Sequence, residues 1–498
     1  MKPASGTRIR WIGAALALKV LGVLSACGTS TEPSDQVQGA PFIATSLRVA
    51  GPWFTDEQGR VVVLHGTNMI NKLPPFAPDS LGFGDKDLSF LAANGFNAIR
   101  LGFIWAGVEP SPGIYDDTYI DRVVSTAILA EKYGLLPMLD FHQDGYSMQT
   151  GGDGAPDWAV ITDGAPKLPI PGSAGGLVNG LIPFENFWDD AKAPDGIGLQ
   201  EHYAAAWRHI ALRLSGTPHL VYEIFNEPYA GIVDNAACAD PVGCPEFEVG
   251  KLAPFYEKVL AALRPADPDR MILVEPQFTF GIGVRSWLPR FSDTNIAFAF
   301  HDYCVEEVVG LPATAGCDAL DSVPLANAED HFGSTGEPNI MNEFGAGAPP
   351  NEMAALMAQA DARMLSWVQW AYWAQDAQQP QTYGIVADIN KGPYGTNVKQ
   401  DLLAILNEPF PRLVSGTPRA WQWDAGTATF SAAYTTTRAD GSGSFPLGSV
   451  SEFFVNPRYY PSGYRVEVEG GSVVSDPQSS YLRVAAQAPY VKLSVRPK

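Results

Sequence analysis

Short apolar runs alternate with longer amphipathic stretches through most of the chain. The runs are rich in β-branched and aromatic residues, and many of the stretches between them repeat their apolar positions at helical spacing. This alternation is typical of strand–helix units that build a parallel sheet. Eight runs predict strands, at residues 61–65, 98–103, 135–141, 220–225, 271–274, 296–300, 339–341 and 368–373. Helices are predicted between them, for example at residues 116–133, 200–214, 253–263 and 352–362.

Eight strand–helix repeats predict an α/β fold, and a (β/α)₈ TIM barrel with long loops suits residues 46–411 best. The same runs also fit an open, doubly wound sheet. No segment resembles the Gly-x-Gly-x-x-Gly phosphate turn of many such sheets, which favours the barrel.

The pattern changes near Arg412, where a Ser-Gly-Thr-Pro linker precedes short alternating segments. These segments predict a small C-terminal β-sandwich over residues 412–498. Its aromatic residues Tyr459, Tyr460 and Tyr464 suggest either a surface that contacts carbohydrate or membrane, or ordinary packing in the core.

The N-terminal 27 residues predict a signal peptide. Basic residues precede an apolar stretch at 11–26 that is short for a membrane span. The Leu-Ser-Ala-Cys sequence ending at Cys27 resembles a bacterial lipoprotein processing site, so we expect lipidation of Cys27 and a flexible tether over residues 28–45. The protein is then secreted or lipid-anchored at the bacterial cell surface. Because Lys19 interrupts the apolar stretch, plain secretion with cleavage nearby remains the alternative.

Four of the five cysteines form two local pairs in the sequence. Export to an oxidising compartment favours disulfides between Cys238 and Cys244 and between Cys304 and Cys317. A zinc site is the other interpretation, but there is no Cys-x-x-Cys spacing and no accompanying histidine cluster.

Composition narrows the possible partners. Hydrophobic residues make up 46% of the 498 residues and charged residues 17%, which indicates a folded chain with a large core. A net charge of -21 and a pI near 4.7 argue against nucleic acid as a partner. No cofactor or metal site is visible, and we expect a monomer.

Two of the apolar runs end in an Asn-Glu pair that suggests catalysis. Residues 221–228 read Val-Tyr-Glu-Ile-Phe-Asn-Glu-Pro, and residues 339–345 read Asn-Ile-Met-Asn-Glu-Phe-Gly. In a barrel the strands end at one face, so Glu227 and Glu343 could meet there. A retaining glycosidase needs two carboxyl groups about 5 Å apart, one as nucleophile and one as acid and base. A further Asn-Glu-Pro at residues 407–409 follows a helical pattern and predicts a helix end.

Polar and aromatic residues near the other strand ends extend this candidate site. We expect them to bind substrate or support the catalytic pair: Lys72, Arg100, His142, Asp144, Asn226, His301, Tyr303 and Trp373.

On these motifs the chain resembles clan A, family 5 glycoside hydrolases. The resemblance implies that Glu227 in Asn-Glu-Pro is the acid and base and that Glu343 is the nucleophile. It implies that Arg100 and Tyr303 hold Glu343 ionised, and that Asn226 binds the sugar 2-hydroxyl. His142, His301 and Trp373 match the supporting residues, Trp373 as a flat floor for the sugar ring. We expect the charge of Glu343 to keep Glu227 protonated until the nucleophile has reacted.

The motif Asn-x-x-x-Lys at residues 68–72, the sequence Asp-Phe-His-Gln-Asp at 140–144 and the β domain resemble endoglycoceramidases. This resemblance implies cleavage between glycan and ceramide in glycosphingolipids, with Lys72 and Asp144 contacting the sugar beside the cleaved bond. It also implies transient contact with a membrane or micelle surface. An endo-β-glucanase or β-glucosidase with the same pair, or a non-catalytic glycan-binding protein, are the alternatives.

The long segment between Asp144 and Leu199 is rich in apolar residues. Loops of this length are usually functional. With residues 73–76 it could line a groove for two lipid chains, or it could simply pack onto the barrel.

Overall fold

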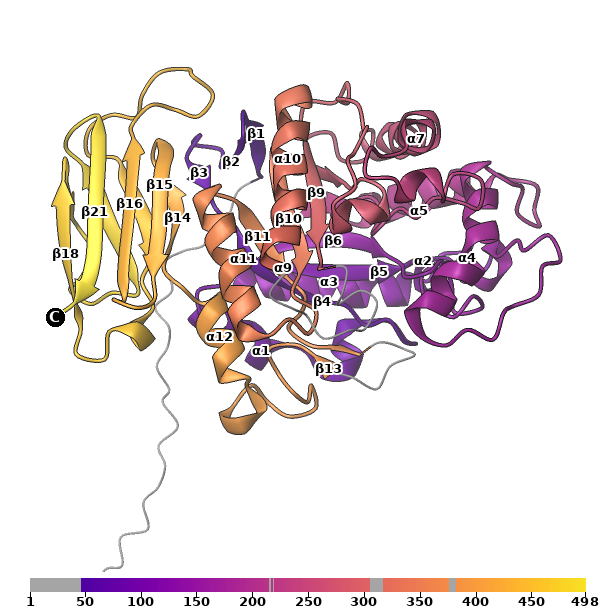
Figure 1. Cartoon of the computed structure of the whole chain (residues 1–498), viewed down its shortest axis with the longest axis horizontal. Coiled ribbons are helices and arrows are strands. Elements are labelled where there is room, and N and C mark those ends of the chain that lie inside the picture. The colour runs from indigo at the N-terminus through magenta and orange to yellow at the C-terminus, as the bar shows by residue number, and fades with distance from the viewer. Residues whose placement is uncertain (1–45, 215, 218, 305–316, 376–381) are drawn as a thin grey trace, which may run out of the picture. The chain divides into compact units, whose positions relative to one another are not determined.

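The structure is a computed structural model that describes residues 46–498, except 215, 218, 305–316 and 376–381 (Figure 1). The predicted signal peptide, Cys27 and the tether over residues 28–45 lie outside the described residues. Within the described part, no helix combines the length and the apolar character that a membrane span needs.

Eight parallel strands close into a barrel, which confirms the predicted fold. Around the barrel the order is β10-β11-β4-β5-β6-β7-β8-β9, so strands that follow one another in the chain are neighbours. Their bounds are β4 His65–Met69, β5 Ala98–Ile104, β6 Leu136–His142, β7 Val221–Glu223, β8 Ile272–Val274, β9 Ile296–Asp302, β10 Asn339–Phe344 and β11 Ser366–Gln369.

Helices follow the strands, and the four helices predicted above are present as α3, α5, α7 and α11. The Asp116 side chain caps α3 by accepting hydrogen bonds from the backbone N–H groups of Thr118 and Tyr119. The described helices are α1 Asp85–Ala93, α2 Trp105–Val108, α3 Asp117–Lys132, α4 Gly172–Trp188, α5 Leu199–Arg213, α6 Pro245–Phe247, α7 Ala253–Leu263, α9 Cys317–Leu320, α10 Ser322–Thr335, α11 Pro350–Ala362 and α12 Gln400–Leu406.

The first predicted barrel strand was wrong. Residues Val61–Val62 form β3, which pairs antiparallel with β14 (Phe410–Val414) outside the barrel. The barrel begins instead at β4, whose sequence His-Gly-Thr-Asn-Met is polar although all five residues are buried. The apolar pattern fails here because Thr67 and Asn68 use their polar groups for hydrogen bonds inside the barrel.

The C-terminal region is a sandwich of antiparallel sheets, as predicted. One sheet has the order β1-β2-β3-β14-β17-β20-β19 and the other β15-β16-β21-β18. Three strands from the start of the described chain therefore belong to the first sheet. The remaining bounds are β1 Arg48–Ala50, β2 Trp53–Thr55, β12 Ala374–Gln375, β13 Thr382–Tyr383, β15 Thr417–Asp424, β16 Thr429–Thr435, β17 Val450–Phe454, β18 Tyr464–Glu469, β19 Gly471–Val473, β20 Tyr481–Ala486 and β21 Tyr490–Pro497.

The tyrosines of this region are packing residues. Tyr460 and Tyr464 are buried in the sandwich core, and Tyr459 packs against Trp423 and donates a hydrogen bond to Asn407 Oδ1 at 3.0 Å. Asn407 itself is the cap residue at the end of α12, as the helix-end interpretation of this Asn-Glu-Pro predicts.

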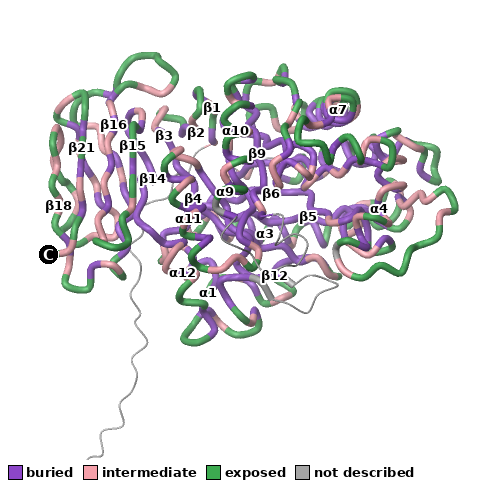
Figure 2. Tube along the Cα trace, in the orientation of Figure 1, coloured by how far each residue is buried: buried purple, intermediate pink, exposed green. Residues whose placement is uncertain are grey.

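The long segment after Asp144 contains a helix, α4, that the sequence pattern did not predict. Its last turns pack onto the barrel, because Phe184, Phe187 and Trp188 are buried among aromatic rings of α5, α7 and the end of β7. Ile170, ahead of α4, and Val178, in the first half of α4, remain exposed. Exposed stretches of the chain are visible beside the α4 label in Figure 2. Packing therefore explains both ends of this segment, because Tyr146 and Ala159 are also buried in the core, but not its exposed middle.

Both predicted disulfides are present. Cys238–Cys244 lies in the loop after β7, and Cys304–Cys317 joins the end of β9 to α9. With these four thiols bonded in pairs, they do not form a zinc site.

Candidate functional site

The carboxyl groups of Glu227 and Glu343 meet at the C-terminal face of the barrel. Glu227 follows β7, and Glu343 lies near the end of β10. One carboxyl oxygen of each residue and a ring nitrogen of His301 all lie within 4.8 Å of one another. This separation agrees with the roughly 5–5.5 Å of retaining glycosidases and is too small for the water of an inverting site.

Glu343 receives hydrogen bonds on both oxygens. Arg100 Nη1 donates to Oε1, and the hydroxyl of Tyr303 donates to Oε2 at 2.9 Å. Both carboxyl oxygens of Glu343 therefore serve as acceptors of hydrogen bonds from protein side chains. Arg100 and Tyr303 therefore lie where the prediction put them, against the candidate nucleophile.

Glu227 has a different environment. Its Oε1 lies 2.7 Å from His301 Nδ1, and its side chain is 17% exposed toward the mouth of the barrel. Burial raises the pKa of Glu227; hydrogen bonding and the charge of His301 lower it, and the charge of Glu343 raises it. The charge of Glu343 thus raises the pKa of Glu227 as expected, but burial raises it more.

Arg100 lies fully buried at the centre of the site. Its guanidinium forms a bidentate pair with Glu223, at 2.8 Å and 2.5 Å, and also donates to Asn226 Oδ1 at 2.7 Å and Asn68 Oδ1 at 3.0 Å. Asn226 in turn donates from Nδ2 to the carbonyl oxygen of Gln143 at 2.9 Å. Arg100 thus fixes Asn226 beside the catalytic pair, while the predicted bond from Asn226 to a sugar hydroxyl stays a prediction.

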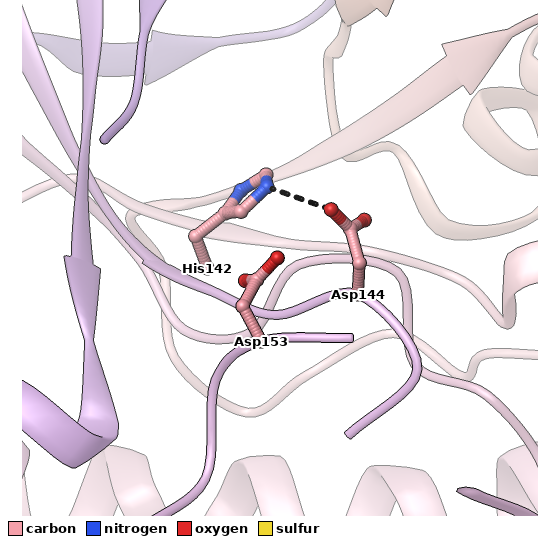
Figure 3. Close-up of side chains that lie close together, drawn as sticks. All are labelled: His142, Asp144 and Asp153. Atoms are coloured by element: carbon pink, nitrogen blue, oxygen red, sulfur yellow. Dashed lines mark ion pairs between the residues drawn. The ribbon is translucent and has the colours of Figure 1, made fainter. Parts of the chain in front are cut away.

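A second group of charges lies at the end of β6, where His142, Asp144 and Asp153 come together (Figure 3). His142 Nδ1 lies 2.9 Å from Asp140, and its Nε2 lies 3.8 Å from Asp144. Burial lowers the pKa of His142, but the two neighbouring carboxylates outweigh it and raise the pKa to about 10. Lys72 forms an ion pair with Asp144, so this predicted sugar-binding pair is assembled.

Asp153 belongs to the same group and was not predicted from the sequence. Its backbone pairs with that of Asp144, and its side chain is buried. Burial and the charge of Asp144 raise the pKa of Asp153, while burial is outweighed at Asp144, where Lys72 and His142 lower the pKa. The two neighbouring carboxyl groups therefore have pKa values shifted in opposite directions.

A tryptophan that the sequence analysis did not single out, Trp370, lies directly after β11 and against the group at the end of β6. The ring of Trp370 stacks on His142 with centroids 5.4 Å apart, and Lys72 Nζ lies 4.6 Å from its centroid. Strand β11 ends at Gln369, four residues before the predicted end, so the first side chain beyond the strand is Trp370. Trp373 and Trp370 are about equally buried, at 7% and 6% exposed, and belong to the same core, so the role of Trp373 as a sugar floor stays a prediction.

Two further acidic residues near the pair were missed. Glu223 in β7 binds Arg100, and Glu275 directly after β8 accepts a hydrogen bond from the backbone N–H of Glu227 at 2.8 Å. The sequence did contain a signal for Glu275, because this residue directly follows the predicted strand that ends at Val274. Glu223 gave no such signal, since it lies inside an apolar run.

Among the residues that the structure describes, three groups of side chains bring ligand atoms close enough for a metal ion, and all three include carboxylates and a histidine. The protein's own cations already neutralise them: Lys72 pairs with Asp144, and Arg100 pairs with Glu223 and Glu343. Ion pairing thus accounts for these groups without a metal, and the expectation that the protein needs none stays a prediction.

Comparison with known proteins agrees with this geometry. Residues 56–376 match the family model for cellulase, glycosyl hydrolase family 5, and residues 409–496 match the glycoside hydrolase family 5 C-terminal domain. The chain is 29% identical to endoglycoceramidase I of Rhodococcus hoagii over 456 residues, which cover 89% of this chain and 86% of that protein.

Two solved structures of endo-glycoceramidase II from Rhodococcus sp. are similar to the chain as well. The lactosyl-enzyme intermediate has a TM-score of 0.72 at 28% identity, and the ganglioside GM3 complex has a TM-score of 0.70 at 28% identity. Each alignment covers 90% of this chain and 99% of the other.

The raised pKa of Glu227 predicts how activity depends on pH. If Glu227 is the acid, activity needs its protonated form and falls as the pH rises through that pKa. We expect Glu227→Gln to lower kcat/KM on an alkyl β-glycoside by about 10²–10⁴-fold. On an aryl β-glycoside with a good leaving group, the variant should lose less and should no longer show this alkaline limb. Glu408→Gln, at the other buried Asn-Glu-Pro, is the matched control and should keep the wild-type profile.

A pair of matched variants tests which tryptophan carries the sugar. Trp370→Leu should lower kcat/KM on a soluble β-glycoside by about tenfold, because a stacked aromatic contact contributes roughly 0.5–1.5 kcal/mol beyond its buried area. Trp373→Leu should leave kcat/KM within about threefold of the wild type in protein that remains folded, as a thermal melt would verify. The reverse order of effects would restore the role to Trp373.

Proposed function

Because the chain belongs to glycoside hydrolase family 5, we propose that it is a retaining endo-glycosidase that cleaves glycosphingolipids between oligosaccharide and ceramide. One observation carries this proposal: the endoglycoceramidase likeness runs through the barrel and the C-terminal sheets together, over 86% or more of the relatives cited above. A generic glycosidase barrel alone would not extend the likeness to both parts.

The proposed reaction uses the catalytic pair in two steps. Glu343 Oε attacks the anomeric carbon and forms a glycosyl ester, while the bond from that carbon to the ceramide oxygen breaks and Glu227 protonates the leaving oxygen. Glu227, now a carboxylate, removes a proton from water, whose oxygen attacks the same carbon and releases Glu343. The glycan leaves with its original β configuration.

The groups at the end of β6 support a polar site for the glycan beside the pair. Lys72 offers an ammonium donor, Asp144 an acceptor and Trp370 an aromatic face, all held by contacts among themselves and with His142. A charged pair next to an aromatic ring suits a sugar, which presents hydroxyl groups at its edge and C–H groups on its face.

Exposed apolar side chains near the site support transient contact with a membrane or micelle surface. Leu168, Ile170 and Val178 are exposed on the segment after β6, and Ile232 and Val233 are exposed on the loop after β7. The two segments are neighbours, because the backbone N–H of Ile232 donates to the carbonyl oxygen of Leu181 in α4 at 3.1 Å. Such a patch could enter the interfacial region of a lipid surface.

We further propose that the protein is secreted or anchored through a lipid on Cys27. Support comes from the signal-like N-terminal sequence and from the two disulfides, since disulfides persist mainly in oxidising compartments outside the cytosol.

Product analysis on defined substrates tests the proposed function. Incubation with a ganglioside should release the intact oligosaccharide and free ceramide, both identified by mass spectrometry, whereas a soluble β-glucan should be cut at least about 10²-fold more slowly. Glu343→Gly should lose hydrolysis and regain turnover with azide, which replaces the missing nucleophile. Faster cleavage of the glucan would identify an endo-β-glucanase, and no turnover of any glycoside would identify a binding protein.

Charged substitutions in the apolar patch test the membrane contact. The double variant Ile170→Asp, Val178→Asp should lower the rate on ganglioside in vesicles by about tenfold, because two exposed apolar side chains that enter the lipid surface are replaced by charges that stay in water. The rate on a soluble aryl β-glycoside should not change. Val474→Asp, at an exposed apolar position of the C-terminal region, is the control. Equal rates of the double variant and the wild type on vesicles would contradict the proposed contact.

A further inference from the structure

Glu275 connects the candidate acid to the histidine beside it. Its Oε2 accepts the backbone N–H of Glu227 at 2.8 Å, and its Oε1 lies 3.1 Å from His301 Nε2. The side-chain amide of Asn342 also donates to Oε1, at 3.0 Å. The carboxylate is almost fully buried, with 2% of the residue exposed.

We propose that Glu275 is a positioning residue for the acid–base step, which it supports by holding the backbone of Glu227 and orienting His301 toward the Glu227 carboxyl group. This inference rests on the proposed function, because it assigns Glu275 a part in that reaction. Glu275 acts through its two neighbours and is not placed against the substrate.

The backbone of Glu227 needs such a support. Its φ is 45°, in the left-handed region that residues other than glycine rarely adopt. Pro228 follows directly and further restricts the conformation of Glu227. A hydrogen bond from the Glu227 N–H to a buried carboxylate is charge-assisted and stronger than a neutral one. Glu275 thus stabilises the unusual conformation that accompanies the orientation of Glu227.

The two nitrogens of His301 have separate partners. Nε2 faces Glu275, while Nδ1 lies 2.7 Å from Glu227 Oε1 and 3.5 Å from Glu343 Oε2. With the Glu275 carboxylate 3.1 Å from Nε2 as an ion-pair partner, the ring lies so that Nδ1 points at the candidate catalytic pair. This arrangement resembles other sites in which one carboxylate orients a histidine toward a reacting group.

The charged residues around His301 determine in which direction the loss of Glu275 would shift the pKa values of His301 and Glu227. Burial lowers the pKa of His301, but the carboxylates of Glu275 and Glu343 outweigh it and raise the pKa well above its usual value. Arg100 lies 3.6 Å from Glu275 and limits the negative charge there, and Glu223 lies against both. Without the charge of Glu275, His301 would lose its proton more readily. The pKa of Glu227 would then rise, because the charge of His301 lowers it.

The variant Glu275→Gln removes this charge and keeps the size and an oxygen for the Glu227 N–H. We expect kcat/KM on an alkyl β-glycoside to fall by about tenfold or more, since cleavage of a poor leaving group depends on the acid. On a dinitrophenyl β-glycoside, whose leaving group needs no proton, the loss should stay below about threefold. The alkaline limb of kcat/KM should move to higher pH.

Glu248→Gln is the matched control. Glu248 is also fully buried, but its carboxylate accepts hydrogen bonds from Gln277, Ser286 and Trp287 rather than contacting His301 or Glu227. Glu248→Gln should not lower kcat/KM on the alkyl β-glycoside more than on the dinitrophenyl β-glycoside. Its pH profile should match that of the wild type.

The outcomes separate this inference from the function on which it rests. If Glu275→Gln lowered kcat/KM equally on both glycosides, or left the alkaline limb of the pH profile where it is in the wild type, the positioning role would be overturned. Turnover by the wild-type protein in the same experiment would still support the proposed function. If wild-type protein turned over neither glycoside nor ganglioside, both would be overturned. Should Glu275→Gln not fold, His301→Gln breaks the same connection from the other side, and a loss on the alkyl glycoside alone would support the inference.

Discussion

The full burial of one guanidinium group constrains this site more than any other interaction. A charge removed from water is costly unless it is paired and hydrogen-bonded, and Arg100 is 0% exposed. Its partners come from different strands: Glu223 from β7, Glu343 from β10 and Asn68 from β4. The barrel can satisfy Arg100 only when these strands are closed around it. The same closure brings the candidate nucleophile to its position, so folding and site assembly depend on one set of contacts.

That arrangement also gives the two glutamates of the site different surroundings. Glu343 accepts hydrogen bonds from Arg100 and Tyr303. Glu227 has no arginine, and burial raises its pKa against the opposing effect of His301. The reaction proposed above needs an acid and a nucleophile, and two glutamates can fill these different roles because their neighbouring side chains differ. The charge of the nucleophile, which sequence reasoning expected to dominate, is a smaller contribution than the loss of water.

The sequence predicted what depends on continuous apolar runs and failed where polar groups are buried. Strands such as β5 and β6 were found because nearly every residue in them is apolar. Strand β4 was missed because its polar residues are buried inside the barrel, and the apolar β3 was taken in its place. Helix α4 was missed because its glycines and Pro183 hide the helical pattern. Trp370 was overlooked since an apolar run shows where hydrophobic residues end, whereas a strand ends where its hydrogen bonds end.

The repeated Asn-Glu-Pro tripeptide shows why motif and structure must be read together. Glu227 and Glu408 are both largely buried, and burial raises the pKa of both. Next to Glu408, however, the charged neighbour is Asp361, which accepts from the indole of Trp421 at 2.7 Å and raises the pKa further. Glu227 instead faces a histidine and the carboxylate of the candidate nucleophile across 4.8 Å or less. Identical residues in sequence therefore have a buried aspartate as neighbour in one place and a histidine with a second glutamate in the other. The difference comes from the strands that surround Glu227, because they set which charges it meets and whether a substrate can reach it.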